Sequence, residues 1–359
     1  MGYEVDFLAV GGESRCGDAI ALRFGNLLSD PPQQVVIVVD GGFTESGKQL
    51  VDLIKLRYRT DTVDLVVSTH PDSDHICGLR EVLNGLKVGQ LAMHLPWEHA
   101  DRISTWFRDG RVTDASVSEN LRRSLEDAYD LHKDAKRRGI EIVEPFQGTF
   151  GWGGQFTVLA PSRALYESLL PDFRGTPQAA APGLPDTLTT LLGLFARAAE
   201  SLNIETLKDD GGTSAENCSS VVSLLRVEGR AVLLTGDAGI PTLTEAANQL
   251  DSLGVDRASI SLVQVPHHGS RRNVGPTVLN RILGPIRASD VQERTAFASV
   301  ACNADATKHP SKRVTNAFRR RGSPVFVTKG INIWHHRDAP GRDDYSALTP
   351  IPLFAEVDD

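Results

Sequence analysis

Short apolar runs alternate with a helical pattern along the first third of the chain. The runs have the length and the turn-residue borders of β-strands, and they occupy residues 6–10, 19–24, 35–40 and 63–68. Before the fourth run, Leu50, Leu53 and Ile54 recur at helical spacing, which predicts a helix over residues 48–58. We therefore expect a sheet with helices packed on it.

A second half rich in apolar runs follows. Its predicted strands occupy residues 156–160, 219–226, 231–235, 260–265, 296–301 and 325–328. Between the two halves, one continuous helix is predicted over residues 116–138, because apolar residues recur there at helical spacing and Gly139 follows as a natural stop. A shorter helix is expected near residues 76–83. The pattern is typical of an α/β protein with two β-rich halves.

Residues 171–217 differ in composition from the rest of the chain. Prolines punctuate an Ala/Gly-rich stretch, and apolar residues at helical spacing then run from Asp186 to Asn203. We expect an inserted helix on flexible tethers. It either docks on the core or acts as a lid, or as a surface for a protein partner or a second copy of the chain. Residues 338–359 are acidic and without periodicity, which indicates a docked or frayed tail.

The composition narrows the class of protein. The chain has 359 residues, of which 40% are hydrophobic and 23% charged, as in folded globular proteins. It contains no run of about 18 apolar residues and no signal-peptide pattern, and its four cysteines are far apart. These features predict a cytoplasmic protein without a membrane association or a disulfide scaffold.

The strongest chemical signal directly follows the buried run that ends near residue 67. The segment Ser68-Thr69-His70-Pro71-Asp72-Ser73-Asp74-His75 places four side chains of metal-ligand type within six residues at the end of a predicted strand. A polar capping loop with surface histidines is the alternative interpretation. The density of imidazoles and carboxylates favours a metal site, because such clusters are typical of hydrolytic metal centres.

Two later apolar runs end in residues of the same kind. The run LLTGD ends at Asp237, where a carboxylate could bridge two cations and Gly236 permits close approach of the backbone. The run VPHHGS ends in the pair His267 and His268. For each of these three residues alone, a structural role is a serious alternative.

These three segments, in this order, resemble the metallo-β-lactamase superfamily, and more narrowly the hydrolase domain attached to ComEC-type competence DNA-uptake channels. The resemblance extends over about residues 4–335, and the VVDGG run that contains Asp40 supports it. It implies one hydrolase domain over residues 1–337 with a four-layer αββα sandwich, in which two mixed sheets pack face to face. The metal ions would lie at one edge of the sandwich.

The resemblance also implies two cation positions. The superfamily pattern is His-x-His-x-Asp-His, and Asp72 here takes the place of the second His, while Asn217 takes that of a later one. The first position would be formed by His70, Asp72 and Asp237, with Asn217 as a weak fourth ligand. The second would be formed by Asp74, His75, His267 and the shared Asp237. Asp40 and His268 are further candidates for ligation or for hydrogen bonding to a ligand. Oxygen donors at the first position favour Mn²⁺ or Mg²⁺, whereas the second suits Zn²⁺ or Mn²⁺.

The family role of such domains is metal-dependent nuclease activity. We therefore expect a dinuclear metal-dependent phosphodiester hydrolase that cleaves DNA. Asp74 would orient the attacking water, and His309 would protonate or stabilise the departing oxygen, unless it is a surface residue before Pro310.

The charge distribution agrees with an anionic substrate. The formal net charge is -8, yet between residues 256 and 330 Lys and Arg outnumber Asp and Glu by 13 to 4. Arg271, Arg272 and Lys308 adjoin the chemical motifs and are the candidates for phosphate binding. Two alternatives remain open: hydrolysis of a small substrate such as a cyclic nucleotide, a phosphocholine-type ester or a lactone, and a non-catalytic metal-binding interaction module.

Overall fold

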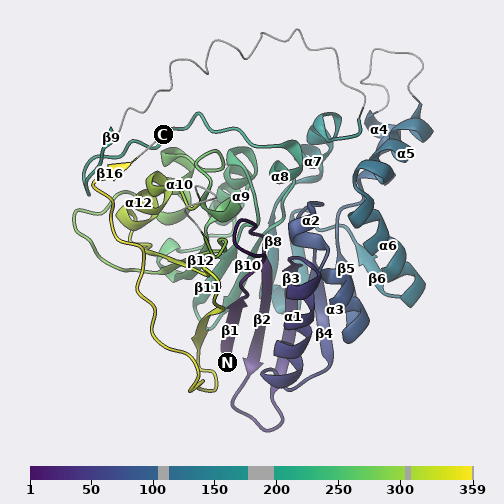
Figure 1. Ribbon diagram of the computed structural model, residues 1–359, viewed down its shortest axis with the longest axis horizontal. Coiled ribbons are helices and arrows are strands. Elements are labelled where there is room, and N and C mark those ends of the chain that lie inside the picture. Colours follow the sequence, from purple (N-terminus) through teal and green to yellow (C-terminus); the bar gives the residue numbers. More distant parts are fainter. Residues whose placement is uncertain (104–112, 177–197, 304–308, 358–359) are drawn as a thin grey trace.

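The computed structural model describes residues 1–103, 113–176, 198–303 and 309–357. Two seven-stranded sheets pack face to face, and helices cover the outer face of each sheet (Figure 1). This is the four-layer αββα arrangement that the sequence resemblance implied.

The first sheet comes from the amino-terminal part of the chain and one late strand. In spatial order its strands are β15 (Ile333–Arg337), β1 (Gly2–Phe7), β2 (Ala19–Asn26), β3 (Gln33–Gly41), β4 (Thr62–Val67), β5 (Lys87–Ala92) and β6 (Glu141–Val143). Strands β3 to β6 run parallel to one another, whereas β15, β1, β2 and β3 pair antiparallel.

The second sheet comes mostly from the later half. In spatial order its strands are β14 (Val325–Val327), β13 (Thr295–Ala298), β12 (Ile260–Gln264), β11 (Arg230–Leu234), β10 (Val222–Val227), β8 (Phe156–Ala160) and β7 (Gly148–Gly151). Strands β11 to β14 run parallel to one another. A small third sheet pairs β9 (Ala198–Ala199) with β16 (Glu356–Val357).

The helices form the outer layers. The α-helices of the described residues are α1 (Thr44–Leu56), α2 (Ser73–Ile76), α3 (Leu79–Gly85), α4 (Ala100–Ile103), α5 (Asp114–Ser124), α6 (Glu126–Arg138), α7 (Arg163–Leu169), α8 (Ala215–Cys218), α9 (Ile240–Ser252), α10 (Pro276–Leu283) and α12 (Lys312–Arg320). The 3₁₀ turns are η1 (Pro96–Glu98), η3 (Trp152–Gly154), η4 (Leu170–Asp172), η5 (Arg257–Ser259) and η6 (Pro266–Gly269). Apolar faces of α1, α3, α5 and α6 pack on the first sheet, and those of α9, α10 and α12 pack on the second.

The alternation of side chains along β3 shows why the layers stack in this way. Ile37 and Val39 point into the core between the two sheets, whereas Val36 and Val38 point toward the helices. All four are buried, because the strand has apolar cover on both faces. A one-residue shift in register would exchange the two faces, so this pattern fixes how the strand sits in the sheet.

Two predicted helices are interrupted in the structure. The helix expected over residues 116–138 breaks at Leu125 (φ −117°, ψ 45°), where the Ser124 hydroxyl donates to the Asn120 carbonyl, a bond that bends helices. The helix expected near residues 76–83 breaks at Gly78. A Cβ atom there would lie 1.9 Å from the carbonyl oxygen of Gly41, so two glycine backbones meet at that point.

Other expectations fail at the edges of the sheets and in the insertion. The first strand lies at Gly2–Phe7 instead of residues 6–10, and the pattern missed β5, β6, β7 and β15, which are short or carry polar residues. The helix expected over Asp186 to Asn203 lies mostly outside the described residues. Its end is not helical, because Ala198 and Ala199 form β9.

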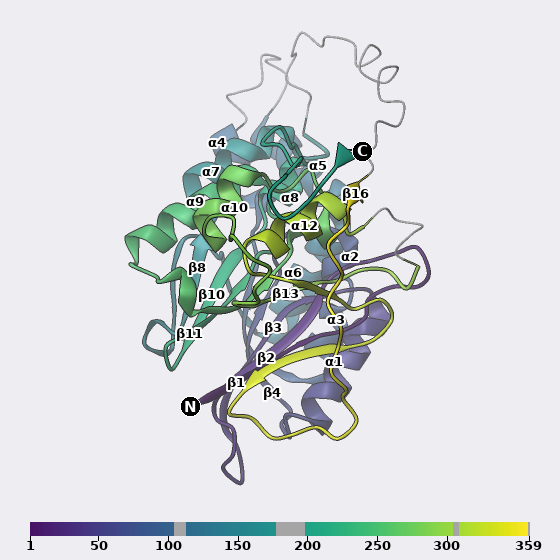
Figure 2. The ribbon, with the colours of Figure 1, turned by 90° about the vertical axis from the view of Figure 1, so that its left-hand side faces the viewer.

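The described part of the tail docks on the sandwich instead of fraying. Figure 2 shows it running from β15 toward β16, which pairs with β9. The side chain of Arg342 donates to both carboxylate oxygens of Asp6, at 2.5 and 2.9 Å, and lies 3.5 Å from Glu4. Tyr58 also donates to Asp6, at 2.7 Å. Within the described residues, no helix is both long and apolar enough to cross a membrane.

We predict that Arg342→Ala lowers the free energy of unfolding by about 3–5 kcal/mol, because it leaves the buried carboxylate of Asp6 without its cation. Urea denaturation followed by circular dichroism measures the change. Arg57→Ala is the control, since Arg57 pairs with Asp344 of the same tail on an exposed surface, where a loss below about 1 kcal/mol is expected. Equal losses in the two variants would contradict the prediction.

Candidate metal centre

The parallel strands of both sheets end at one edge of the sandwich, and the chemical motifs lie in the loops that follow them. The His70–His75 segment follows β4, Asp237 follows β11, and the His267–His268 pair lies in η6 after β12. Asn217 lies in α8, just before β10. Loops from the two halves of the chain therefore meet at this edge.

Asp237 lies at the middle of this meeting point. Its Oδ2 atom is 3.5 Å from Nε2 of His75 and 3.6 Å from Nε2 of His267. The Nε2 atoms of His70 and His268 each lie 3.9 Å from the same oxygen. Four imidazoles thus present the same nitrogen to one buried carboxylate.

The two remaining carboxylates of the motif lie on separate sides of Asp237. Oδ2 of Asp72 is 3.6 Å from Nε2 of His70. Oδ2 of Asp74 is 3.9 Å from Nε2 of both His75 and His268. The side chains of Asp72 and Asp74 are 25% and 33% exposed, so the centre is open to solvent at these two carboxylates.

The paired histidines have different neighbours around Asp237. His268, rather than His267, shares Asp74 and His75, and these three side chains offer ligand atoms within 4.8 Å of one another. His267 lies next to Asn217, whose Nδ2 is 3.2 Å from Nδ1 of His267. Both histidines have a left-handed backbone, with φ of 47° and 56°, and both present Nε2 to Asp237. Such residues cost about 1–3 kcal/mol each and cluster at functional sites.

Hydrogen bonds at Nδ1 orient the rings that flank Asp237. His75 donates from Nδ1 to Asp40 at 2.8 Å, so Asp40 lies behind the imidazole and not among the facing atoms. Thr69 donates its hydroxyl to Asp40 at 2.6 Å and lies 3.0 Å from Nδ1 of His70. His268 donates to the carbonyl of Ser299 at 3.0 Å. Each of these bonds leaves the lone pair of Nε2 free for a ligand role.

His267 and the Asp237 turn are held in a similar way. Nδ1 of His267 donates to Asn273 at 2.9 Å, and Asn273 donates to the carbonyl of Asp237 at 2.8 Å. Gln264 accepts the backbone N–H of Gly236 at 3.0 Å and donates to Asp18 at 2.8 Å. The sequence analysis did not identify these supporting residues. Their signal is weak, because each is a single polar residue near a strand end.

The atoms that face the centre lack other partners. Among the described residues, five buried atoms here have no hydrogen bond: Nε2 of His70, His75 and His268, Oδ1 of Asn217 and Oδ1 of Asp237. Leaving a buried polar group unsatisfied costs about 1–3 kcal/mol. All five atoms are of the kinds that ligate divalent cations, so the residues present fit such ions.

The pKa shifts of the groups that face Asp237 also indicate a site for positive charge. Burial alone would lower the pKa of both His75 and His268, yet Asp237 raises the pKa of His268 to about 10 and that of His75 well above its usual range. Burial alone would raise the pKa of Asp237, but the surrounding histidines hold it well below its usual range. Positive charge close to these carboxylates is therefore stabilising. Protons on the histidines and divalent cations compete to provide that charge.

The remaining candidates lie around this centre. The ring of His309 is 6.1 Å from that of His267, and His309 is partly buried. Arg271 and Arg272 are exposed and follow the histidine pair, whereas Lys308 lies outside the described residues. Other basic residues of the late segment serve the fold. Arg320 and Arg321 are buried and pair with Glu200 and Glu205.

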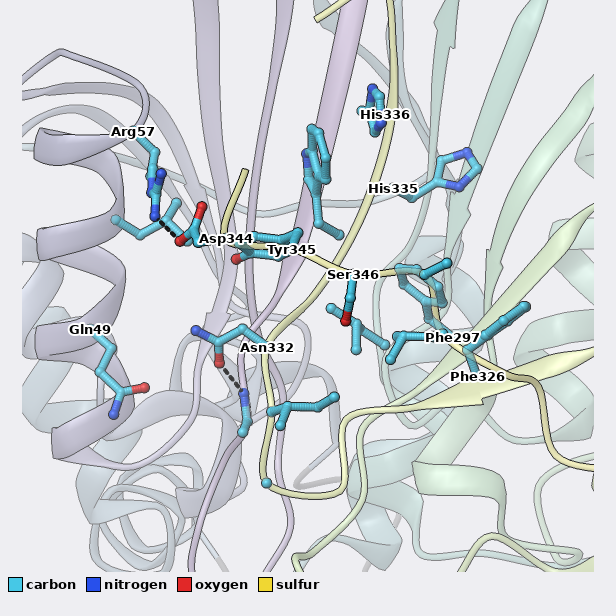
Figure 3. Close-up of a pocket in the computed structure, with 18 of the residues that line it drawn as sticks. Gln49, Arg57, Phe297, Phe326, Asn332, His335, His336, Asp344, Tyr345 and Ser346 are labelled. Atoms are coloured by element: carbon cyan, nitrogen blue, oxygen red, sulfur yellow. Dashed lines mark hydrogen bonds and ion pairs between the residues drawn. The ribbon is translucent and has the colours of Figure 1, made fainter. Parts of the chain in front are cut away.

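A cleft of about 1080 Å³ lies elsewhere, and none of the metal candidates lines it. Figure 3 shows it between Gln49 of α1 and Arg57, which follows α1, on one side and the tail with Asp344 to Ser346 on the other. Strand β15, with His335 and His336, forms another wall. The chemistry described above therefore does not depend on this cleft.

We predict that the unaltered protein binds two Mn²⁺ ions per chain and that His268→Gln binds one, because Nε2 of His268 faces both Asp74 and Asp237. His336→Gln, which changes an exposed histidine of β15, is expected to keep both ions. Elemental analysis after equilibrium dialysis against Mn²⁺ measures the content. Two retained ions in His268→Gln would contradict this assignment.

Part of the chain matches a known protein family. Residues 33–160, which include Asp40 and the His70–His75 loop, match the model of the metallo-beta-lactamase superfamily. No curated protein matches the chain.

Similar solved structures include a diphosphatase of the PhnP family (9% identity, TM-score 0.40, 94% of this chain and 98% of that one). They also include a metallo-beta-lactamase from Hirschia baltica, with 13% identity and a TM-score of 0.33 over 78% of this chain and 91% of that one. Zn²⁺-bound PqqB from Methylobacterium extorquens has 12% identity and a TM-score of 0.35 over 92% of this chain and 99% of that one. The chain is therefore similar to the metallo-beta-lactamase superfamily over residues 33–160, and its four-layer fold agrees with that similarity.

Proposed function

We propose that this protein is a dinuclear metal-dependent phosphodiester hydrolase that degrades DNA. The observation that carries the proposal is the convergence of four Nε2 atoms on Oδ2 of Asp237, at 3.5–3.9 Å. Two divalent cations bound here would supply Lewis acidity, lowering the pKa of a water and neutralising charge on a phosphodiester.

The donor atoms differ between the two sides of Asp237. The first cation would be held by His70, Asp72 and Asp237, with Asn217 as the weak fourth ligand that the sequence resemblance implies. The second would be held by Asp74, His75, His268 and the shared Asp237. The first set is rich in oxygen donors, which favour Mn²⁺ or Mg²⁺, and the second suits Zn²⁺ or Mn²⁺. We therefore propose Mn²⁺ as the ion that supports activity at both positions.

The reacting groups would be oriented by residues on the open side. Asp74 is partly exposed, and its Oδ2 atom lies 3.9 Å from Nε2 of both His75 and His268, which is beyond hydrogen-bond distance. This oxygen can therefore accept a proton from the attacking water. Burial, together with the charge of His268 and His267, lowers the pKa of His309 to about 4. A neutral imidazole remains a hydrogen-bond donor, so stabilisation of the departing oxygen suits His309 better than delivery of a proton.

The substrate class is proposed from the surface beside the centre. Arg271 and Arg272 project into solvent directly after the histidine pair, where they can contact phosphates on either side of a scissile bond. A small phosphodiester would use the metal centre without these arginines. The competing proposal of a small-molecule hydrolase is therefore decided by comparing DNA with small chromogenic esters.

We predict that purified protein degrades single- or double-stranded DNA when Mn²⁺ is added. Asp74→Ala and His75→Ala should each lower the rate by at least about 100-fold, because each removes a proposed ligand of the second cation. A 100-fold loss corresponds to about 2.8 kcal/mol of transition-state stabilisation. Asp61→Ala is the matched control, since Asp61 precedes the amino end of β4 while Asp74 follows its carboxyl end. A panel of chromogenic phosphodiesters is assayed in parallel.

The outcomes of this assay separate the alternatives. Turnover of small esters with intact DNA would favour the small-molecule hydrolase. Protein that hydrolyses nothing and retains less than one metal ion per chain would favour a non-catalytic module. Full DNA cleavage by Asp74→Ala and His75→Ala would refute the proposed centre.

A second prediction concerns the arginines. Arg271→Ala and Arg272→Ala should each weaken DNA binding and reduce the slope of log affinity against log salt concentration by about 1. Fluorescence anisotropy over a salt series, in Ca²⁺ to prevent cleavage, measures the slope. Arg230→Ala is the control because Arg230 is exposed at the amino end of β11, opposite to Asp237. An unchanged slope in the Arg271 and Arg272 variants would remove this substrate contact.

A further inference from the structure

Arg174 joins the two halves of the candidate centre, and nothing in the sequence patterns indicated it. Its Nη2 atom donates to Oδ1 of Asp72 at 2.7 Å. Its backbone N–H donates to Oε1 of Glu216 at 2.7 Å, and its Nε lies 3.9 Å from the same oxygen. Asp72 belongs to the loop after β4, whereas Glu216 lies beside Asn217 in α8.

The backbone of Arg174 is fixed by its neighbours. Phe173 is buried in the core between the first sheet and its helices, with its ring 6.1 Å from that of Tyr166 in an edge-to-face arrangement. The hydroxyl of Thr176 donates to the carbonyl of Phe173 at 2.6 Å. Arg174 therefore extends from an anchored turn, and its guanidinium is not a freely moving surface group.

The bond from Arg174 occupies one oxygen of Asp72 and leaves the other to the centre. Oδ2 of Asp72 lies 3.6 Å from Nε2 of His70, while Oδ1 is held by the guanidinium. Charge-assisted bonds of this kind are short and directional. Without Arg174, a carboxylate that is 25% exposed could rotate and offer its oxygens to solvent.

We propose that Arg174 is a positioning residue for the first cation, because it fixes Asp72 as a one-oxygen ligand and ties that ligand to the α8 residues next to Asn217. The inference rests on the proposed function for the presence of two cations. It adds that the geometry of the first position depends on a residue that touches neither the cation nor the substrate.

Titration of metal-free protein with Mn²⁺, with free Mn²⁺ followed by electron paramagnetic resonance, tests this inference without any assay of activity. We expect two sites in the unaltered protein. Arg174→Ala should weaken one of them by about 10- to 100-fold and leave the other unchanged, as is typical for partners that orient metal ligands. Arg174→Lys should restore part of the affinity, since an ammonium can still hold Oδ1.

Three further variants make the result specific. Asp72→Asn should weaken the same site, and Arg174→Ala combined with Asp72→Asn should weaken it no more than Asp72→Asn alone, because both act through one carboxylate. Arg80→Ala is the matched control: Arg80 is 42% exposed and binds Asp134 at 2.9 Å, and Arg174 is 47% exposed. It should bind Mn²⁺ like the unaltered protein.

These measurements distinguish failure of the proposed dinuclear centre from failure of the role proposed for Arg174. Fewer than two sites in the unaltered protein would overturn the proposed dinuclear centre and this inference together. Two sites of unchanged affinity in Arg174→Ala would overturn the inference alone. If that variant also showed a raised KM for DNA, Arg174 would instead contact the substrate. Circular dichroism of Arg174→Ala verifies that weakened binding is measured on folded protein.

Discussion

The buried carboxylate of Asp237 is the constraint on which the candidate centre depends. A carboxylate removed from water is costly unless positive charge or hydrogen bonds surround it. Here four imidazoles from the two segments that follow β4 and β12 face one of its oxygens, and each ring is oriented from behind by Asp40, Thr69, Asn273 or the Ser299 carbonyl. The histidines can meet the charge of Asp237 with protons or pass that role to divalent cations. The supporting residues matter because they hold the rings in place in either state.

The sandwich supplies the rigidity that this arrangement needs. Strands β3 and β4 of the first sheet, and β11 and β12 of the second, end at the same edge, so short loops suffice to bring their side chains together. The apolar core between the sheets fixes the separation of the two loop sets. Close backbone contacts, such as that of Gly41 with Gly78, bring the loops nearer than larger residues would permit.

The sequence predicted the central strands well and drew attention to the His70–His75 loop, but it did not reveal features that depend on tertiary contacts. The runs at residues 19–24 and 35–40 lie in β2 and β3, and the run at 63–68 overlaps β4 except for its last residue, because buried strands carry a strong apolar signal. The break at Leu125 depends on a side-chain bond of Ser124, which periodicity does not reveal. The His70–His75 loop is compact enough to be recognised from spacing. The placement of His267 and His268 involves two left-handed backbone positions, and Arg174 reaches Asp72 across 102 residues of chain.

The pairing of β1 with β15 has a consequence for how the molecule assembles. The first strand of the chain lies between β2, which follows it closely, and β15, which is among the last elements. Until β15 arrives, β1 is an open sheet edge whose unpaired amides can recruit foreign strands. Closing it brings together distant parts of the polypeptide, a contact that forms slowly in any folding chain. Arg342 then pairs with Asp6 on β1, so completion of the first sheet and neutralisation of this buried acid belong to one late event.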